Sequence, residues 1–148
     1  MARSSSRAGE SSSMVEQITV ATRGRGLYEI TAEVQDVVAR AGVAEGLCTV
    51  FVRHTSASLV VQENADPSAK RDLERWLDRL VPDGDPFYRH DTEGPDDMPG
   101  HIKSALTATS LAIPILRNEL ALGTWQGVYL WEHRLRGSRR EIVFHLGS

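Results

Sequence analysis

The stretch Phe51-Val-Arg-His-Thr-Ser-Ala-Ser-Leu-Val-Val-Gln-Glu-Asn-Ala-Asp66 decides the fold, because it sets two apolar runs on either side of a small polar connection. Residues 47–52 and 59–61 are short and rich in β-branched side chains, which predicts two buried strands. Residues 54–58 would connect them. Small polar residues at a strand end keep backbone N–H groups and hydroxyls accessible to an anion. The alternative is a turn whose hydroxyls bond their own backbone.

Length and composition predict one domain with a single core. The chain has 148 residues, of which 41% are apolar, and its net charge is −3. This charge argues against a dedicated nucleic-acid binder, which normally carries a basic excess. Four arginines gather near the C-terminus, at positions 134, 136, 139 and 140. That group suits a local anion better than a duplex.

Cysteine usage and hydropathy indicate the compartment. The single cysteine, Cys48, excludes an intramolecular disulfide, favours a reducing environment, and is expected to be a small core side chain. No apolar run approaches the roughly 18 to 20 residues of a membrane span, and no apolar signal segment follows the first arginines. We therefore expect a cytoplasmic protein without a membrane partner.

The chain divides into a tail and one domain. Residues 1–13 contain six serines and almost no apolar side chains, so we predict a disordered tail followed by a folded domain over 14–148. Within the domain, periodicity predicts further strands and helices. The strands are expected over 15–22, 111–115, 123–133 and 141–146, and the helices over 31–41, over 67–80 and from residue 101.

These elements make an α+β domain of six or seven mostly antiparallel strands and three helices. The last two strands are expected to form a hairpin, because Gly137 stands in the turn between them. Trp76 is expected in the core. Gln126 is expected among apolar neighbours, where an unpaired amide costs about 1 to 3 kcal/mol and needs a partner.

A long connection carries much of the chemistry. Residues 82–100 are rich in proline, glycine and acidic side chains, and loops of this length are uncommon in compact domains unless they are functional or disordered. We favour a functional loop because His90 and Asp97 lie in it. Asp97 precedes His101 by four positions, so the two could share a metal or a proton. The alternative is an N-cap aspartate beside a solvent-facing histidine.

The other catalytic patterns are missing from the sequence. No Ser/His/Asp order, phosphate-binding glycine loop or dinucleotide fingerprint occurs, and no two histidines have a local metal-ligand spacing. The metal signal comes instead from carboxylates close to histidines, the usual arrangement of ligands and general bases.

Three separated motifs resemble one family. They are His54-Thr-Ser-Ala-Ser-Leu59 with Glu63-Asn-Ala-Asp66, then His90 with Glu93-Gly-Pro-Asp-Asp-Met-Pro-Gly-His-Ile-Lys103, and finally Leu120-Ala-Leu-Gly-Thr-Trp-Gln-Gly-Val-Tyr129 with Glu132-His-Arg134. In this order they resemble the YjbQ family, called secondary thiamine-phosphate synthase enzymes, from about Val15 to the C-terminus. Gly100 and Trp131 depart from the pattern, since members usually carry alanine and many carry cysteine there.

The resemblance implies a compact α+β fold, a homotrimer, and a cleft containing the matched histidines and acids. It also implies a transferase with weak thiamine-phosphate synthase activity. That reaction couples an aminopyrimidine-methyl diphosphate with a thiazole phosphate and releases pyrophosphate, so the partner would be a phosphorylated small molecule. The family resemblance is stronger evidence for the fold than for the reaction.

A site hypothesis follows from this reaction. A divalent cation, Mg or Zn, would stabilise the leaving pyrophosphate together with positioned N–H donors. The expected catalytic residues are His54, Glu63, Asp97 and His101, and the expected metal ligands are His54, His90 and His101. The expected anion- and substrate-binding residues are Thr55, Ser56, Lys103, Thr124, Gln126 and Arg134, with Thr124 and Gln126 in the cleft wall or at a subunit contact.

Two other classes of function stay open at this point. One is a non-catalytic module that binds a metal and a phosphorylated metabolite in the same pocket. The other is a structural oligomer whose histidines only satisfy hydrogen bonds.

Overall fold

The computed structural model describes residues 13–148, so the predicted tail lies outside the described residues except for Ser13. The strands are β1 (Met14–Ala21), β2 (Gly26–Glu29), β3 (Glu45–Val52), β4 (Ala57–Glu63), β5 (Ser110–Leu116), β6 (Glu119–Leu120), β7 (Gln126–Glu132) and β8 (Arg139–Gly147). The helices are α2 (Thr31–Ala41), α3 (Pro67–Leu80) and α4 (Asp97–Leu106). The α+β prediction is confirmed. The strands that the sequence did not predict, β2 and β6, are too short to show a period.

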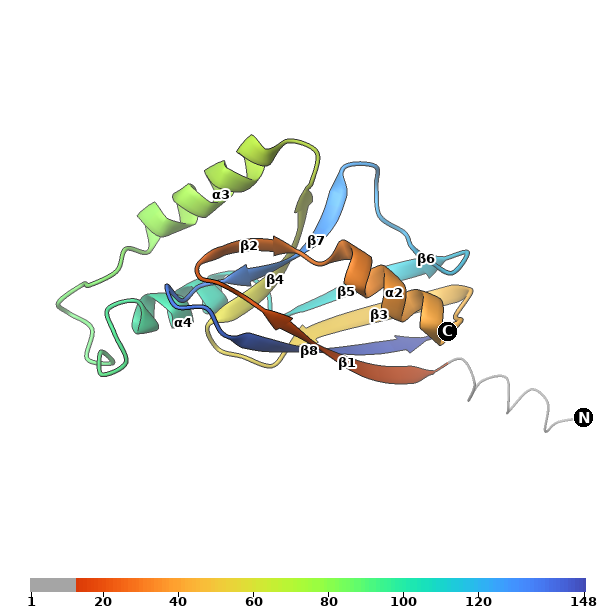
Figure 1. The fold of residues 1–148 in the computed structure, drawn as a ribbon, viewed down its shortest axis with the longest axis horizontal. Coiled ribbons are helices and arrows are strands. Elements are labelled where there is room, and N and C mark those ends of the chain that lie inside the picture. The colour runs from red at the N-terminus through yellow and green to blue at the C-terminus, as the bar shows by residue number, and fades with distance from the viewer. Residues whose placement is uncertain (1–12) are drawn as a thin grey trace, which may run out of the picture.

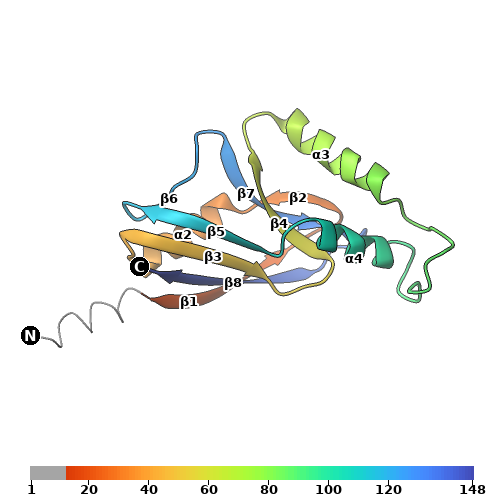
Figure 2. The same ribbon diagram turned by 180° about the vertical axis from the view of Figure 1, so that it is seen from behind.

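The strands form two sheets, seen from two sides in Figures 1 and 2. One sheet has the order β1-β8-β3-β5-β6 and the other β2-β7-β4, with antiparallel neighbours throughout. The predicted hairpin of the last two strands is therefore wrong, because β7 and β8 belong to different sheets. The segment between them crosses over at Gly137, where a Cβ would lie only 2.1 Å from the Thr22 carbonyl oxygen. Glycine permits this close crossing.

The main core lies between the two sheets and under α2. Val34, Val37 and Val38 give α2 its buried face, as their i, i+3, i+4 spacing predicts. Cys48 is also fully buried in this core, which matches its expected structural role. Burial raises the pKa of its thiol to about 11, so it is a poor nucleophile at neutral pH.

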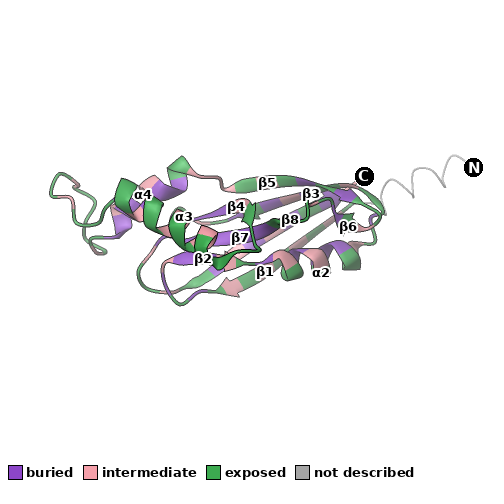
Figure 3. Cartoon of the chain, turned by 90° about the horizontal axis from the view of Figure 1, so that it is seen from above, coloured by how far each residue is buried: buried purple, intermediate pink, exposed green. Residues whose placement is uncertain are grey.

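The smaller sheet is covered on both faces. Along β7, Val128 and Leu130 face the main core, whereas Tyr129 and Trp131 face the other way and pack with Leu77 of α3. Figure 3 shows the buried stretch of β7 with α3 over it. A strand buried on both faces reads as a continuous apolar run, and Val128-Tyr-Leu-Trp131 of β7 is such a run.

The start of α3 follows its local sequence. The Asp66 carboxylate accepts a hydrogen bond from the Ser68 N–H at 2.9 Å, and Pro67 occupies the first helical position, as an Asp-Pro pair before a helical apolar face predicts. The prediction that Trp76 is a core residue is wrong, because its side chain is 52% exposed. The helix lies over a narrow three-stranded sheet, and only Leu77 is fully covered.

The pairing of β4 with β7 gives the fold two distinct ends. Ala57 pairs with Glu132 at one end, where α4 lies, and Glu63 pairs with Gln126 at the other. Figure 1 shows α4 and the α3–α4 connection at one end and the C-terminus at the opposite end. In the part of the chain that the structure describes, no helix is both long and apolar enough to cross a membrane.

Candidate metal centre

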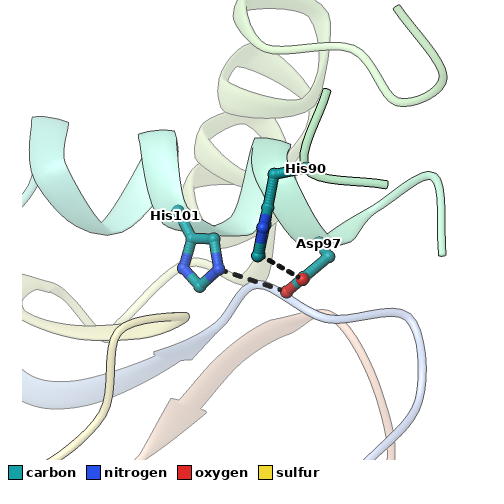
Figure 4. A group of neighbouring side chains, drawn as sticks. All are labelled: His90, Asp97 and His101. Carbon is teal, nitrogen blue, oxygen red and sulfur yellow. Dashed lines mark ion pairs between the residues drawn. The ribbon is translucent and has the colours of Figure 1, made fainter. Parts of the chain in front are cut away.

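Three potential metal ligands meet at the N-terminal end of α4. Asp97 is the first residue of the helix and His101 follows one turn later, so both side chains lie on one helix face. His90 reaches the same point from the connection between α3 and α4. Its Nε2 lies 2.9 Å from Asp97 Oδ2, and His101 Nε2 lies 3.3 Å from Oδ1. Figure 4 shows both rings beside the carboxylate.

The helix begins earlier than the sequence predicts. We expected a start at His101, but α4 begins at Asp97, and Pro99 and Gly100 lie inside its first turns. An acidic residue in the first turn is favourable because it complements the positive end of the helix dipole. The early start is what brings Asp97 and His101 onto the same face.

The hydrogen bonding of His101 leaves its Nε2 unprotonated in the neutral ring. Its Nδ1 lies 3.0 Å from the Thr55 carbonyl oxygen, which can only accept, so Nδ1 carries the proton. The Nε2 lone pair then faces the Asp97 carboxylate. This pairing is unfavourable unless a cation lies between the two groups or the ring takes up a second proton. A ring held by a backbone carbonyl is also the usual state of a metal-bound histidine.

Arg134 holds the carboxylates of this end of the molecule. Its Nη1 donates to Asp97 Oδ1 at 2.9 Å, its Nε donates to Asp96 Oδ2 at 2.9 Å, and its Nη2 donates to the Glu93 carbonyl oxygen. Burial opposes ionisation of Asp96, but the hydrogen bonds from Arg134 and from the Leu135 N–H outweigh it and lower the pKa of Asp96. Arg134 therefore positions the candidate ligand Asp97 and orders the loop before it.

Gly100 allows α4 to approach this arginine. A Cβ at position 100 would lie 3.3 Å from Arg134 Cδ, which is tight, and 3.4 Å from Ser56 Cβ. An alanine at position 100 would therefore need a small shift of Arg134.

The group is open to solvent on the histidine side. The side chain of Asp97 is only 4% exposed, whereas those of His90 and His101 are 52% and 29% exposed. The three ligand atoms lie within 4.8 Å of one another. A hollow of 290 Å³ adjoins His90, and Tyr88 and Met98 contribute to its lining. A cation held here would keep a coordination position accessible from outside.

His54 does not join this group. Its Nε2 accepts a hydrogen bond from the Glu141 N–H at 2.8 Å, and its Nδ1 lies 3.2 Å from Nη1 of Arg140. Both ring nitrogens thus face donors. The set His54, His90 and His101 that the sequence suggested as ligands is therefore not assembled, and Asp97 takes the third place.

Glu63, Thr124 and Gln126 lie at the opposite end of the sheet. Glu63 ends β4 and pairs with Gln126, six residues from the strand end that adjoins the metal cluster, a span of roughly 20 Å. Gln126 is exposed, and its Oε1 accepts from the Gly123 N–H at 2.7 Å. The prediction that Gln126 lies among apolar neighbours is wrong, because the side chain is exposed and closes a turn before β7.

The other predicted anion-binding residues, Lys103, Thr55 and Ser56, do not gather at one point. Lys103 is completely buried, and its Nζ donates to Asp78 of α3 at 2.5 Å, so it does not face the cluster's solvent side. Thr55 contributes its carbonyl oxygen to His101. Ser56 is buried and its Oγ accepts from Arg140 Nη2 at 3.0 Å. Ser56 also lines a hollow.

A buried ion pair beside the site escaped the sequence reasoning. Arg140 forms a hydrogen-bonded pair with Glu132, which is fully buried and also accepts from the Thr22 hydroxyl at 2.6 Å. Burial opposes ionisation of Glu132, but the hydrogen bonds from Arg140 and Thr22 prevail and lower its pKa. The feature of the sequence that could have indicated this pair is the carboxylate of Glu132 at the end of the apolar run of β7.

His133 is the other residue that sequence reasoning missed. It is fully buried, its Nε2 lies 2.8 Å from the Ser58 hydroxyl, and its Nδ1 has no hydrogen-bond partner in the described structure. Burial, followed by the charges of Lys103 and Arg140, lowers the pKa of His133 to about 3. The ring is therefore neutral at physiological pH.

The fold and this cluster define a class of protein: a two-sheet α+β domain with an accessible histidine–carboxylate site at one end. The model of the UPF0047 protein YjbQ-like family matches residues 16–148, and the chain belongs to this family. UPF0047 protein sll1880 of Synechocystis is 56% identical over 133 residues, covering 90% of each chain. UPF0047 protein YjbQ of Escherichia coli O157:H7 is 43% identical over 127 residues, covering 85% of this chain and 91% of that one.

Solved structures share the fold. A conserved protein of the YjbQ/UPF0047 family from Clostridium acetobutylicum has a TM-score of 0.80 at 34% identity, covering 88% of this chain and 98% of that one. A protein from Sulfolobus solfataricus, described as YbjQ-like and of unknown function, has a TM-score of 0.83 at 22% identity, covering 92% and 98% of the two chains.

These comparisons correct the expected activity. The family resemblance predicted from the motifs is confirmed, but the prediction of a thiamine-phosphate synthase is wrong. The relatives are named only as UPF0047 proteins, and the Sulfolobus structure is described as having unknown function.

Proposed function

We propose that this chain binds a divalent transition metal through His90, Asp97 and His101 and uses its open coordination position for Lewis-acid chemistry. The observation that carries the proposal is the convergence of three ligand atoms within 4.8 Å of one another, with the His101 lone pair turned toward a carboxylate. A cation between them converts an unfavourable contact into coordination.

The donor set favours zinc over magnesium. Two imidazole nitrogens and one carboxylate oxygen suit zinc and similar borderline metals, whereas magnesium prefers an all-oxygen octahedron. Sites with three protein ligands usually keep a fourth position for water or substrate, and zinc lowers the pKa of such a water to about 7. Support for an exposed fourth position comes from the accessible sides of His90 and His101.

Arg134 is the proposed support of the metal centre. A carboxylate ligand that is itself hydrogen-bonded has a fixed orientation, and such supporting partners typically contribute about 10- to 100-fold to metal affinity. Its hydrogen bond to Asp97 supports this role. When zinc binds, Asp97 would keep this bond through one oxygen and offer the other to the metal.

The test is a zinc titration by isothermal calorimetry on protein first freed of metal with a chelator. We expect one site per chain, lost in His101→Ala and in His90→Ala. His145→Ala is the matched control, because His145 lies exposed on β8 outside the cluster. Equal zinc affinity in all four proteins would overturn the proposal.

The homotrimer implied by the resemblance is retained as part of the proposal. Its support is the outer face of the five-stranded sheet, where Val15, Leu47, Phe51 and Leu116 are between 43% and 67% exposed. Apolar side chains gathered on one sheet face are typical of surfaces that bind another protein. Light scattering coupled to gel filtration tests it: a trimer mass is expected, and a monomer mass would contradict it.

A further inference from the structure

A second hollow lies beside the metal cluster. It has a volume of 340 Å³ and is formed by the segment between β7 and β8 and the start of β8, together with the connection before β4 and Glu93 of the α3–α4 connection. Its lining residues are Ser56, Glu93, Arg134, Arg136, Gly137, Ser138 and Arg140. The arginine group noted near the C-terminus of the sequence thus supplies three of the residues of one hollow.

The charges of these arginines are not equally balanced. Arg134 is paired with Asp96 and Asp97, and Arg140 is paired with the buried Glu132. Arg136 has no ion pair or hydrogen bond with any residue between 13 and 148. The nearby exposed carboxylate of Glu93 interacts electrostatically with Arg134, not with Arg136. Arg136 therefore brings an unpaired positive charge and a free set of N–H donors to the hollow.

The contact between His54 and Arg140 is a second, independent observation, because it lacks a hydrogen-bond acceptor. Because His54 Nε2 accepts from the Glu141 N–H, a neutral ring must carry its proton on Nδ1. That Nδ1 lies 3.2 Å from Nη1 of Arg140, which is always a donor. Two donors thus face each other, and burial together with the Arg140 charge lowers the pKa of His54 and disfavours a second proton.

We propose that this hollow binds the oxyanion of a small molecule, a phosphate or a carboxylate group, through Arg136, Ser138 and Arg140. His54 does not line the hollow itself but contacts Arg140 from behind it. An oxygen atom that accepts from Arg140 would relieve the conflict between the two facing donors. The volume exceeds what one such group fills, so the remainder of the molecule has room. This site goes beyond the metal centre and rests on different residues.

Arg134 connects the two sites. It lines the hollow and also donates to Asp97 of the metal cluster. A molecule anchored in the hollow by its anionic group would therefore lie on the Arg134 side of the metal cluster.

Calorimetry on metal-free protein tests the anion site separately from the metal. Inorganic phosphate and acetate are titrated into wild type, Arg136→Gln and the control Arg139→Gln, whose side chain is exposed on β8 and outside the hollow. Loss of a charge-assisted donor predicts about 10-fold weaker binding in Arg136→Gln and no change in the control. Tighter binding of phosphate would indicate a phosphoryl ligand, and tighter binding of acetate a carboxylate. No binding of either, or equal binding in all three proteins, would overturn the proposal.

Nitrogen NMR of the His54 ring gives a readout that a purely structural arginine would not change. We expect the Nδ1-protonated tautomer in free protein and a shift of the Nδ1 resonance when phosphate is added. An Nε2-protonated ring that phosphate leaves unmoved would overturn the proposal. Both measurements are made without metal, so failure of the metal centre leaves their result intact.

Discussion

The two ends of β4 differ sharply although one apolar strand connects them. At the end that begins with Ala57, the paired strand supplies Glu132, and the neighbouring segments add the metal cluster and the arginine-lined hollow. At the end formed by Glu63 and Gln126, both side chains are exposed, and that of Gln126 closes a local turn. Strand pairing, not distance along the sequence, decides which polar residues share a site.

The two ends also differ in how strongly their polar side chains affect the free energy of unfolding. The site end contains buried charges that need partners, whereas the far end contains polar groups that water can satisfy. Substitutions at the two ends should therefore have very different effects, and the following predictions rank them.

The largest expected effect is on the buried ion pair. Glu132→Gln leaves Arg140 buried without a countercharge, which should lower the free energy of unfolding by about 3 to 5 kcal/mol. Urea denaturation at pH 7 measures it. The pKa of Glu132 is lower in the folded state than in the unfolded chain. The stability that the ionised Glu132 contributes is therefore fully present at pH values above its ordinary pKa, and it is lost as the pH falls through the folded-state pKa. Gln126→Ala at the far end is the control and should stay within about 0.5 kcal/mol of wild type.

The next effect is on the proposed metal ligand that is most buried. Asp97→Asn keeps an oxygen for Arg134 but removes the negative charge, and zinc affinity should fall by about 100-fold or more. Glu63→Gln removes a carboxylate at the far end of β4 and should leave zinc affinity unchanged. A calorimetric titration of the two variants compares the ends directly, and equal losses would refute the distinction.

The buried histidine predicts a pH dependence of stability. The unfolded chain binds a proton at His133 near pH 6.5, whereas the folded protein does so only near pH 3. Between these values the unfolded state holds more protons, so stability falls as the pH falls, by at most about 1.4 kcal/mol per pH unit. His133→Gln should lose this contribution. Urea denaturation of both proteins at pH 7 and pH 5 measures it, and identical slopes would contradict the burial argument.

The smallest effect concerns the buried lysine. Lys103→Met replaces an ammonium group whose hydrogen-bond partner, Asp78, has a 42% exposed side chain and can be hydrated without it. Exchanging a buried ion for an apolar chain of similar length is often neutral, so unfolding free energy should change by no more than about 1 kcal/mol. Zinc affinity should not change. A thermal unfolding scan with and without zinc checks both statements.

Local patterns predicted the elements better than their assembly. The valines of α2, the cap at Asp66 and the apolar run of β7 each follow from neighbouring residues, and they are found as expected. The partners of β8 depend on contacts far apart in the chain, so the predicted hairpin with β7 was wrong. The prediction that Trp76 is buried was wrong for a similar reason, because its burial depends on the width of the sheet that α3 covers.

The site was predictable only in part. The four-residue spacing of Asp97 and His101 anticipated the two residues that the helix brings together, and His90 came from the same loop. His54 shares their chemistry, but the Glu141 N–H and Arg140 engage its ring instead. Arg136 and Arg140 could be grouped from the sequence, yet only the crossing at Gly137 makes them part of one hollow.

The most direct test of the central claim is an anomalous difference map from a crystal grown with zinc and without chelator. The structure predicts a peak coordinated by Nε2 of His90, Nε2 of His101 and a carboxylate oxygen of Asp97, with Arg134 still bonded to that carboxylate. An empty cluster in zinc-containing crystals, or a peak on His54 or Glu63 instead, would contradict it.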